Sequence, residues 1–167
     1  MNPQISPSQL NEVIKRLRPL HAKLAPPKDG DWLKAHPEQG QTFREYQKCD
    51  PVRPTTKRRT IYVQPIGTFT PEQQQILNLT VEFIGVYLCL PVVMQEPLPP
   101  TAIPAKARRS VLGSAAPQIL STYILDEVLL PSLPQDAASR IALTANDLWP
   151  GNGWNYVFGQ ASTGDRV

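Results

Sequence analysis

Apolar side chains recur at helical spacing near the start of the chain and predict a helix over residues 8–25. These apolar positions are Leu10, Val13, Ile14, Leu17, Leu20 and Leu24. Ser8 is the expected cap, and Pro26 and Pro27 end the helix. Residues 28–57 show no such period, so we expect them to be irregular, with a proline-rich linker at 51–54.

The pattern then changes to a strand followed by a second helix. Thr60–Gln64 is β-branched and aromatic, which predicts a buried strand. Thr70 is a capping residue, Pro71 suits the first helical position, and Glu72 places an acid in the first turn. One face of this helix is apolar, and Pro91 ends it. That face comprises Ile76, Leu79, Phe83, Val86, Tyr87 and Leu90.

Further elements follow at short intervals. We expect a strand at 92–95, a helix at 115–130, a strand at 140–144, a turn at 148–153 and a fourth strand at 154–159. In the third helix the residues expected to face the core are Leu120, Tyr123, Ile124 and Val128. This order predicts an α/β fold, a mixed twisted sheet flanked by helices, with right-handed crossovers between parallel strands. We expect an extension over 1–58 and a compact domain over 59–167.

Composition narrows the classes of partner. Residues 1–59 hold 12 Lys or Arg against 6 Asp or Glu, whereas residues 60–167 hold 5 against 8. The basic arm lacks interleaved aromatic residues, so a solvated extension is favoured over nucleic-acid or other anion binding. No apolar run reaches the roughly 20 residues of a membrane span, and the start of the chain is polar. Neither Cys49 nor Cys89 belongs to a C-x-x-C pair, and Cys89 is expected to be free and buried, so a cytoplasmic location is predicted.

Residues that could carry chemistry are sparse. His21 and His36 are the two histidines, and no H-E-x-x-H motif is present. A zinc site needs three or four converging ligands, so we assign no metal ligand. There is no G-x-S-x-G elbow, and Asp126 and Glu127 are adjacent on a helix and face different ways. We therefore assign no catalytic residue.

Four segments together carry a family resemblance. They are D-W-L-K-A-H-P-E at 31–38, R-T-I-Y-V-Q-P-I-G at 59–67, A-L-T-A-N-D-L-W-P at 142–150 and W-N-Y-V-F-G-Q-A-S at 154–162. In order and spacing they resemble the archaemetzincins, zinc metallopeptidases of the metzincin clan. The resemblance implies an incomplete, metzincin-like N-terminal subdomain. The family's H-E-x-x-H-x-x-G-x-x-H-C helix binds zinc, but no ligand of that zinc is present here, so we expect this chain to be inactive by itself.

One element of a peptidase site is implied by the resemblance. In metzincins an edge strand pairs with extended substrate backbone, and the corresponding residues here are Asn155, Tyr156, Val157, Phe158 and Gly159. An ordinary core strand is the alternative reading of these residues. The expected partner is a peptide or protein substrate. The alternative function is a naturally short, non-catalytic form that binds a protein or peptide through this strand. The oligomeric state stays open.

Overall fold

The computed structural model describes residues 6–22, 24–37, 39–111, 117–151 and 153–167. Contacts divide the chain into two units, residues 1–45 and residues 46–167, and each unit is described by itself. The expected division into an extension over 1–58 and a domain over 59–167 stays a prediction.

The first unit is helical where it has regular structure. It contains α1 (Pro7–Leu17), the 3₁₀ turn η1 (Arg18–Leu20), α2 (Trp32–Ala35) and the start of α3 (Phe43–Lys48). The predicted helix over 8–25 is thus too long. Its cap is Ser6, since the Ser6 hydroxyl accepts from the Gln9 amide and the Gln9 side chain accepts from the Ser6 amide. The expectation of a wholly irregular 28–57 was also wrong, because α2 and α3 lie there.

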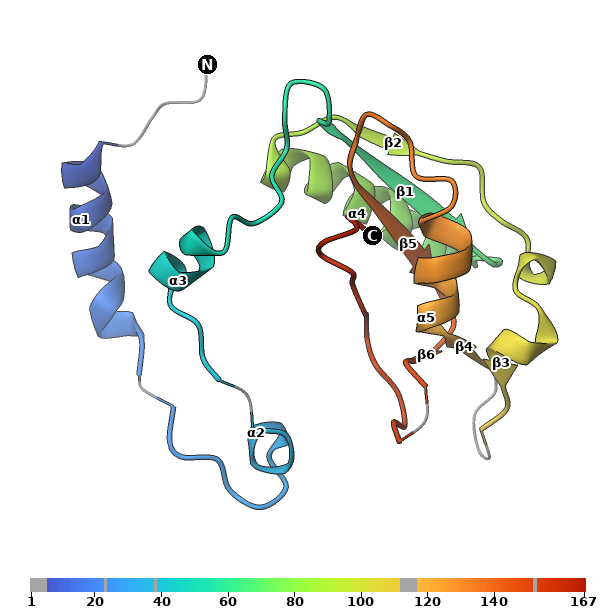
Figure 1. Ribbon diagram of the computed structural model, residues 1–167, viewed down its shortest axis with the longest axis horizontal. Coiled ribbons are helices and arrows are strands. Elements are labelled where there is room, and N and C mark those ends of the chain that lie inside the picture. Colours follow the sequence, from blue (N-terminus) through green and yellow to red (C-terminus); the bar gives the residue numbers. More distant parts are fainter. Residues whose placement is uncertain (1–5, 23, 38, 112–116, 152) are drawn as a thin grey trace. The chain divides into compact units, whose positions relative to one another are not determined.

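The second unit is built on a parallel sheet. The strand order is β2 (Val92–Met94), β1 (Thr60–Ile66) and β5 (Ala137–Thr144), with β1 in the centre and parallel to both neighbours (Figure 1). The predicted strands at 60–64, 92–95 and 140–144 are therefore present, with shifted ends. The α/β fold class is confirmed.

Helix α4 (Pro71–Leu88) connects β1 to β2 and begins as predicted. Thr70 and Gln73 form a reciprocal cap, and Pro71 occupies the first helical position. The helix ends at Cys89, which has a left-handed backbone with φ of 53° and an exposed side chain. The prediction of a buried Cys89 was wrong, because the chain turns there toward β2. None of the described helices combines the length and the apolar composition needed to cross a bilayer.

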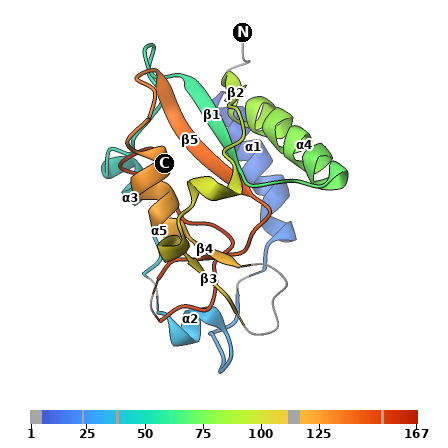
Figure 2. The same ribbon diagram turned by 90° about the vertical axis from the view of Figure 1, so that its right-hand side faces the viewer.

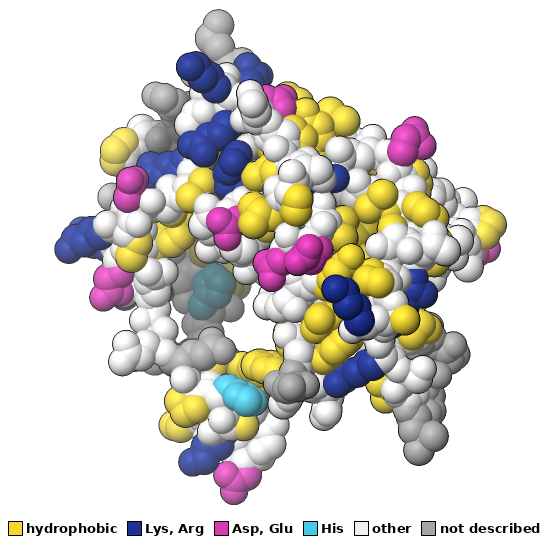
Figure 3. Space-filling model, turned by 45° about the vertical axis from the view of Figure 1, so that its right-hand side comes forward, with side chains coloured by type: hydrophobic (Ala, Val, Ile, Leu, Met, Phe, Trp, Pro, Cys, Tyr) yellow, Lys and Arg dark blue, Asp and Glu magenta, His cyan; other side chains and the backbone are white. Residues whose placement is uncertain are grey.

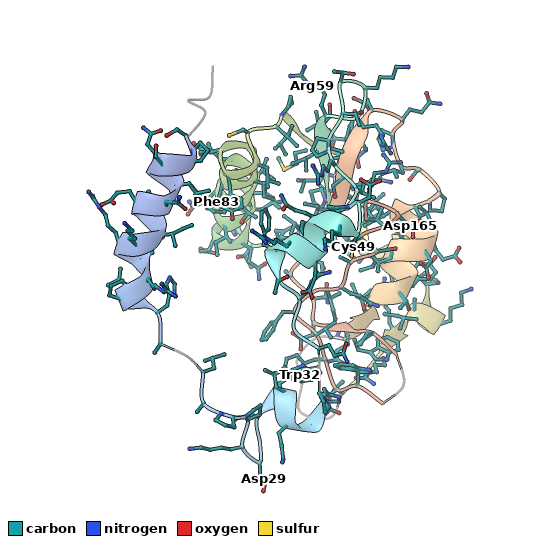
Figure 4. The ribbon with its side chains drawn as sticks, turned by 60° about the vertical axis from the view of Figure 1, so that its left-hand side comes forward. Asp29, Trp32, Cys49, Arg59, Phe83 and Asp165 are labelled. Atoms are coloured by element: carbon teal, nitrogen blue, oxygen red, sulfur yellow. The ribbon has the colours of Figure 1, made fainter. Side chains whose placement is uncertain are left out.

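The apolar face of α4 lies mostly in solvent. Leu77 is its single buried residue, and the side chain of Phe83, labelled in Figure 4, is 63% exposed. Other exposed members of this face are Ile76, Leu79, Val86 and Tyr87. The helical period predicted in the sequence is correct, but within this unit the stripe does not face the core.

A second, small sheet lies beyond the carboxyl ends of β1 and β5. Its order is β3 (Arg108–Arg109), β4 (Gln118–Leu120) and β6 (Leu148–Trp149). The predicted helix over 115–130 begins only at α5 (Ser121–Tyr123), which continues as the π-helix η4 (Ile124–Leu129), because the preceding residues pair with β3 and β6. Residues 115 and 116 lie outside the described part. The turns η2 (Pro100–Ala102) and η3 (Ala105–Ala107) precede β3.

The elements of this unit form layers. Helix α4 lies on one face of the parallel sheet, and α5 with η4 lies on the other (Figure 2). The main core fills the space on the η4 side. It comprises Ile66, Ile103, Ala107, Ile119, Ile124, Leu125, Leu129 and Val167. Figure 3 shows hydrophobic side chains also at the surface, interspersed with charged ones.

A buried arginine joins these layers. Arg140 on β5 is 4% exposed, and its Nη1 lies 3.0 Å from the carbonyl oxygen of Leu129 and 3.1 Å from that of Ser132. Its Nη2 donates to Oε1 of Gln64 at 3.0 Å, and its Nε donates to Oε1 of Gln95 at 2.8 Å. The guanidinium therefore ties the end of η4 to β1 and to the residue after β2.

The charge of Arg140 is balanced by dipoles rather than by an acid. In the described part of the chain no carboxylate forms an ion pair with it. Carbonyl oxygens at the C-terminal end of a helix carry partial negative charge, which suits a cation. Burial lowers the pKa of Arg140 from its ordinary value, but an arginine remains charged at neutral pH.

We predict that Arg140→Ala lowers the free energy of unfolding by about 3 kcal/mol or more, because several buried acceptors lose their donor together. Arg140→Lys should recover only part of this loss, since an ammonium cannot reach all of the same oxygens. Urea denaturation followed by circular dichroism measures both. The control is Arg59→Ala, an exposed side chain just before β1 (Figure 4), expected within about 0.5 kcal/mol of the parent. Equal effects at both positions would contradict the role given to Arg140.

Candidate peptide-binding site

The residues predicted to bind substrate do not form a regular strand. Over Trp154–Gly159 the only regular pairing described is a single antiparallel bridge, in which the Val157 amide donates to the Leu148 carbonyl at 2.9 Å. The predicted fourth strand was therefore wrong as a strand. The turn predicted at 148–153 is present only in part. Leu148–Trp149 form β6 instead, Gly151 and Gly153 have the positive φ typical of turns, and residue 152 lies outside the described part.

Side chains occupy the carbonyl groups that a strand would use for pairing. Nη2 of Arg109 donates to the carbonyl oxygen of Trp154 at 3.1 Å and to that of Asn155 at 2.6 Å. Nε2 of Gln118 donates to the same Asn155 oxygen at 3.1 Å. The carbonyl groups of Trp154 and Asn155 are thus hydrogen-bonded to two side chains of the small sheet and not to a neighbouring strand.

Arg109 is itself held in place. Its Nε donates to Oε1 of Gln118 at 2.8 Å, and its guanidinium lies 4.8 Å from the ring centroid of Trp149, within cation–π range. Gln118 is buried. Sequence reasoning missed this anchor, because an arginine in a proline-rich basic stretch reads as a surface residue.

Beyond the anchor, the segment presents two aromatic side chains. Tyr156 is 56% exposed and Phe158 is 95% exposed, and their rings pack edge to face with centroids 5.4 Å apart. The two rings therefore lie side by side on the segment. Within the described part of the chain, the backbone groups of Tyr156 and Phe158 make no hydrogen bond. Backbone N–H and C=O groups without partners can pair with an added strand.

A cavity of about 380 Å³ lies beside this segment. Phe158, Gly159 and Gln160 line one side of it, and Leu125 and Leu129 of η4 line another. The Ser121 hydroxyl donates to Oε1 of Gln160 at 2.5 Å, which fixes that side chain at the rim. The site can therefore hold a short apolar group next to an exposed backbone segment.

The described residues do not fit a zinc site. No group of three His, Cys, Asp or Glu side chains among them lies close enough together to hold a metal ion. His21 and His36 lie in the first unit, where the ring of His36 packs on Trp32 with centroids 4.0 Å apart. We derive no catalytic step through a metal from these residues.

Comparison with known proteins finds similarity to the archaemetzincins. The chain is 32% identical over 166 residues to "Archaemetzincin-2" of Macaca fascicularis, covering 95% of this chain and 45% of that protein. The chain is homologous to the archaemetzincins. It is also 32% identical to the human "Archaemetzincin-2" over 164 residues and 27% identical to the human "Archaemetzincin-1" over 145 residues. The resemblance inferred from the four segments is confirmed.

The match covers part of each relative. The chain spans about half the length of the archaemetzincin-2 relatives, and 28% of the human archaemetzincin-1. This agrees with the N-terminal part of an archaemetzincin. No family model matches the chain, and no solved structure matches it.

We predict that Arg109→Ala makes the segment around Asn155 open more often to solvent. Loss of hydrogen bonds from a charged donor costs about 2 kcal/mol, which corresponds to roughly 30-fold faster amide exchange at Val157. Hydrogen exchange measured by NMR tests this. Lys106→Ala, at a nearby exposed cation, is the control and should leave the exchange rate of Val157 unchanged. An unchanged rate in Arg109→Ala would show that the segment is held by other contacts.

Proposed function

We propose that this chain is part of a zinc-dependent metallopeptidase of archaemetzincin type and that Asn155–Gly159 binds the backbone of an extended peptide. The similarity to archaemetzincin-2 of two primates and the resemblance of four segments support the family activity. The observation that carries the role of this chain is the exposed backbone of Tyr156 and Phe158, held on a side-chain anchor.

The anchored segment suits strand addition. A peptide laid along it would pair with the N–H and C=O groups of Tyr156 and Phe158, while their rings contact side chains of the peptide. Arg109 and Gln118 hold the start of the segment, so little backbone freedom is lost on binding. The edge of β5 is already partly occupied, because the Arg140 amide donates to the Arg166 carbonyl at 2.9 Å. The segment 155–159 is therefore a better site for an added strand than the edge of β5.

In the proposed enzyme the metal and its general base come from residues other than these 167. The sequence contains no H-E-x-x-H, and the described residues offer no alternative ligand cluster. When bound, the zinc ion would activate water for attack on the peptide carbonyl. The residues of this chain then bind and orient the peptide, and we assign them no proton transfer.

We predict that the 167-residue chain, purified and dialysed, retains no stoichiometric zinc and hydrolyses no peptide. Atomic absorption spectroscopy measures the zinc content, and a mixed fluorogenic peptide library measures hydrolysis. One tightly bound zinc per chain would overturn the assignment of the metal ligands to other residues.

We predict that peptide binding depends on Phe158 and Tyr156. Alanine at either position should weaken the binding of an extended peptide about tenfold, because each ring supplies an exposed apolar contact. Fluorescence anisotropy with peptides selected from a library measures this. Phe83→Ala on α4 is the matched control, since Phe83 is also an exposed aromatic residue. N-methylation of alternate peptide amides should abolish binding, and full retention of affinity would exclude strand addition.

The binding-module alternative is distinguished by the natural gene product. Its intact mass, together with the reading frame sequenced past Val167, is the decisive measurement. A longer product carrying H-E-x-x-H supports the peptidase. A product near 18.6 kDa that binds peptides without hydrolysing them supports the module.

A further inference from the structure

A second cavity lies at the carboxyl end of the parallel sheet. Its volume is about 240 Å³. It is lined by Gly67 and Thr68 after β1, by Asn146 after β5, and by Arg108 and Ile119 of the small sheet. Figure 2 shows β3 and β4 beneath the carboxyl ends of β1 and β5. Crevices at this end of a parallel sheet are the usual place where α/β proteins bind ligands.

One cation lines this cavity, and no acid does so among the described residues. The Nε of Arg108 is buried and has no hydrogen-bond acceptor in the described part of the chain, where no carboxylate forms an ion pair with Arg108 either. By contrast, Arg109 and Arg140 of the same unit each donate several hydrogen bonds. A buried N–H without an acceptor costs about 1–3 kcal/mol, so a missing acceptor is the simplest explanation.

The remaining walls are mostly apolar. Ile66, Ile103 and Ile119 belong to the lining, together with Pro100 and Pro117. Thr68 is exposed at the mouth. Gly67 has a φ of 96°, and a side chain at this position would lie 3.5 Å from Oδ1 of Asn146. The chain thus reaches the rim through a backbone conformation that favours glycine.

We propose that this cavity binds a small carboxylate, with the anionic group on the guanidinium of Arg108 and a short apolar body against the isoleucines. A guanidinium binds a carboxylate through two parallel hydrogen bonds, and one of its donors here is Nε. A single cation with apolar walls suits a monoanion with a hydrocarbon part better than a phosphate dianion, which needs several donors. The volume limits the bound group to the size of a side chain.

The carboxylate can come from a free organic acid or from the C-terminus of a peptide. The proposal does not depend on the peptidase activity, because it uses none of the residues Asn155–Gly159. Its experiment therefore reads binding alone.

The test compares propionate with propionamide by NMR titration of the full 167-residue chain. Propionate should cause saturable shifts of the Gly67 and Ile119 amides, with a Kd of about 1 mM, and propionamide should not. Arg108→Gln should weaken propionate binding at least tenfold. Lys106→Gln, which removes a nearby exposed cation outside the cavity lining, should leave it unchanged. Equal shifts with acid and amide, or no saturation, would overturn the proposal.

Two further arms complete the test. Thr68→Phe adds bulk at the exposed mouth, so it should block binding without unfolding the protein and stands in if Arg108→Gln does not fold. Unchanged propionate binding in folded Thr68→Phe would contradict the site.

An N-acetylated dipeptide acid and its amide identify the source of the carboxylate. Binding of the dipeptide acid at least tenfold tighter than propionate indicates a peptide C-terminus, and weaker binding indicates a free acid.

Discussion

The second unit depends on one buried guanidinium. From β5, the Arg140 side chain donates hydrogen bonds to the end of η4, to Gln64 on β1 and to Gln95 after β2. A single side chain thus joins β5, β1 and the residue after β2 to the helix that covers them. Such a group is stable in the interior only when its donors meet acceptors of fixed geometry. The position of η4, and with it the core on that side of the sheet, follows from meeting this requirement.

Two cavities lie next to these elements. The larger one lies between η4 and the segment after Phe158, and the smaller one lies where β1 and β5 end above the small sheet. Strand β3 of the small sheet supplies Arg108 and Arg109, the two cationic residues near the proposed binding sites. Arg109 has its hydrogen bonds satisfied by the backbone and organises the peptide-binding segment, whereas Nε of Arg108 lacks an acceptor and marks a place for an anion. Adjacent residues of one strand thus take different roles, because successive side chains point to opposite faces.

The similarity to the archaemetzincins bears on the role of these features. The chain covers 45% of its archaemetzincin-2 relatives, and none of its described residues fits a metal site. Under the proposed function, the residues of this chain bind and orient the peptide. The exposed apolar face of α4 is larger than a scatter of single residues, and such faces often mark an interface.

How much the sequence determined varies from element to element. The capping residues Thr70 and Pro71 and the β-branched run Thr60–Gln64 act through neighbours close in the chain, so α4 and β1 were correctly predicted. The α/β class and the resemblance to the archaemetzincins were also correctly predicted. Other features depend on partners distant in sequence. Trp154–Gly159 has the composition of a strand, but side chains about 40 residues earlier bind its carbonyl groups. Arg140 reads as an ordinary strand residue, yet tertiary structure buries it, because only the folded chain brings its acceptors together.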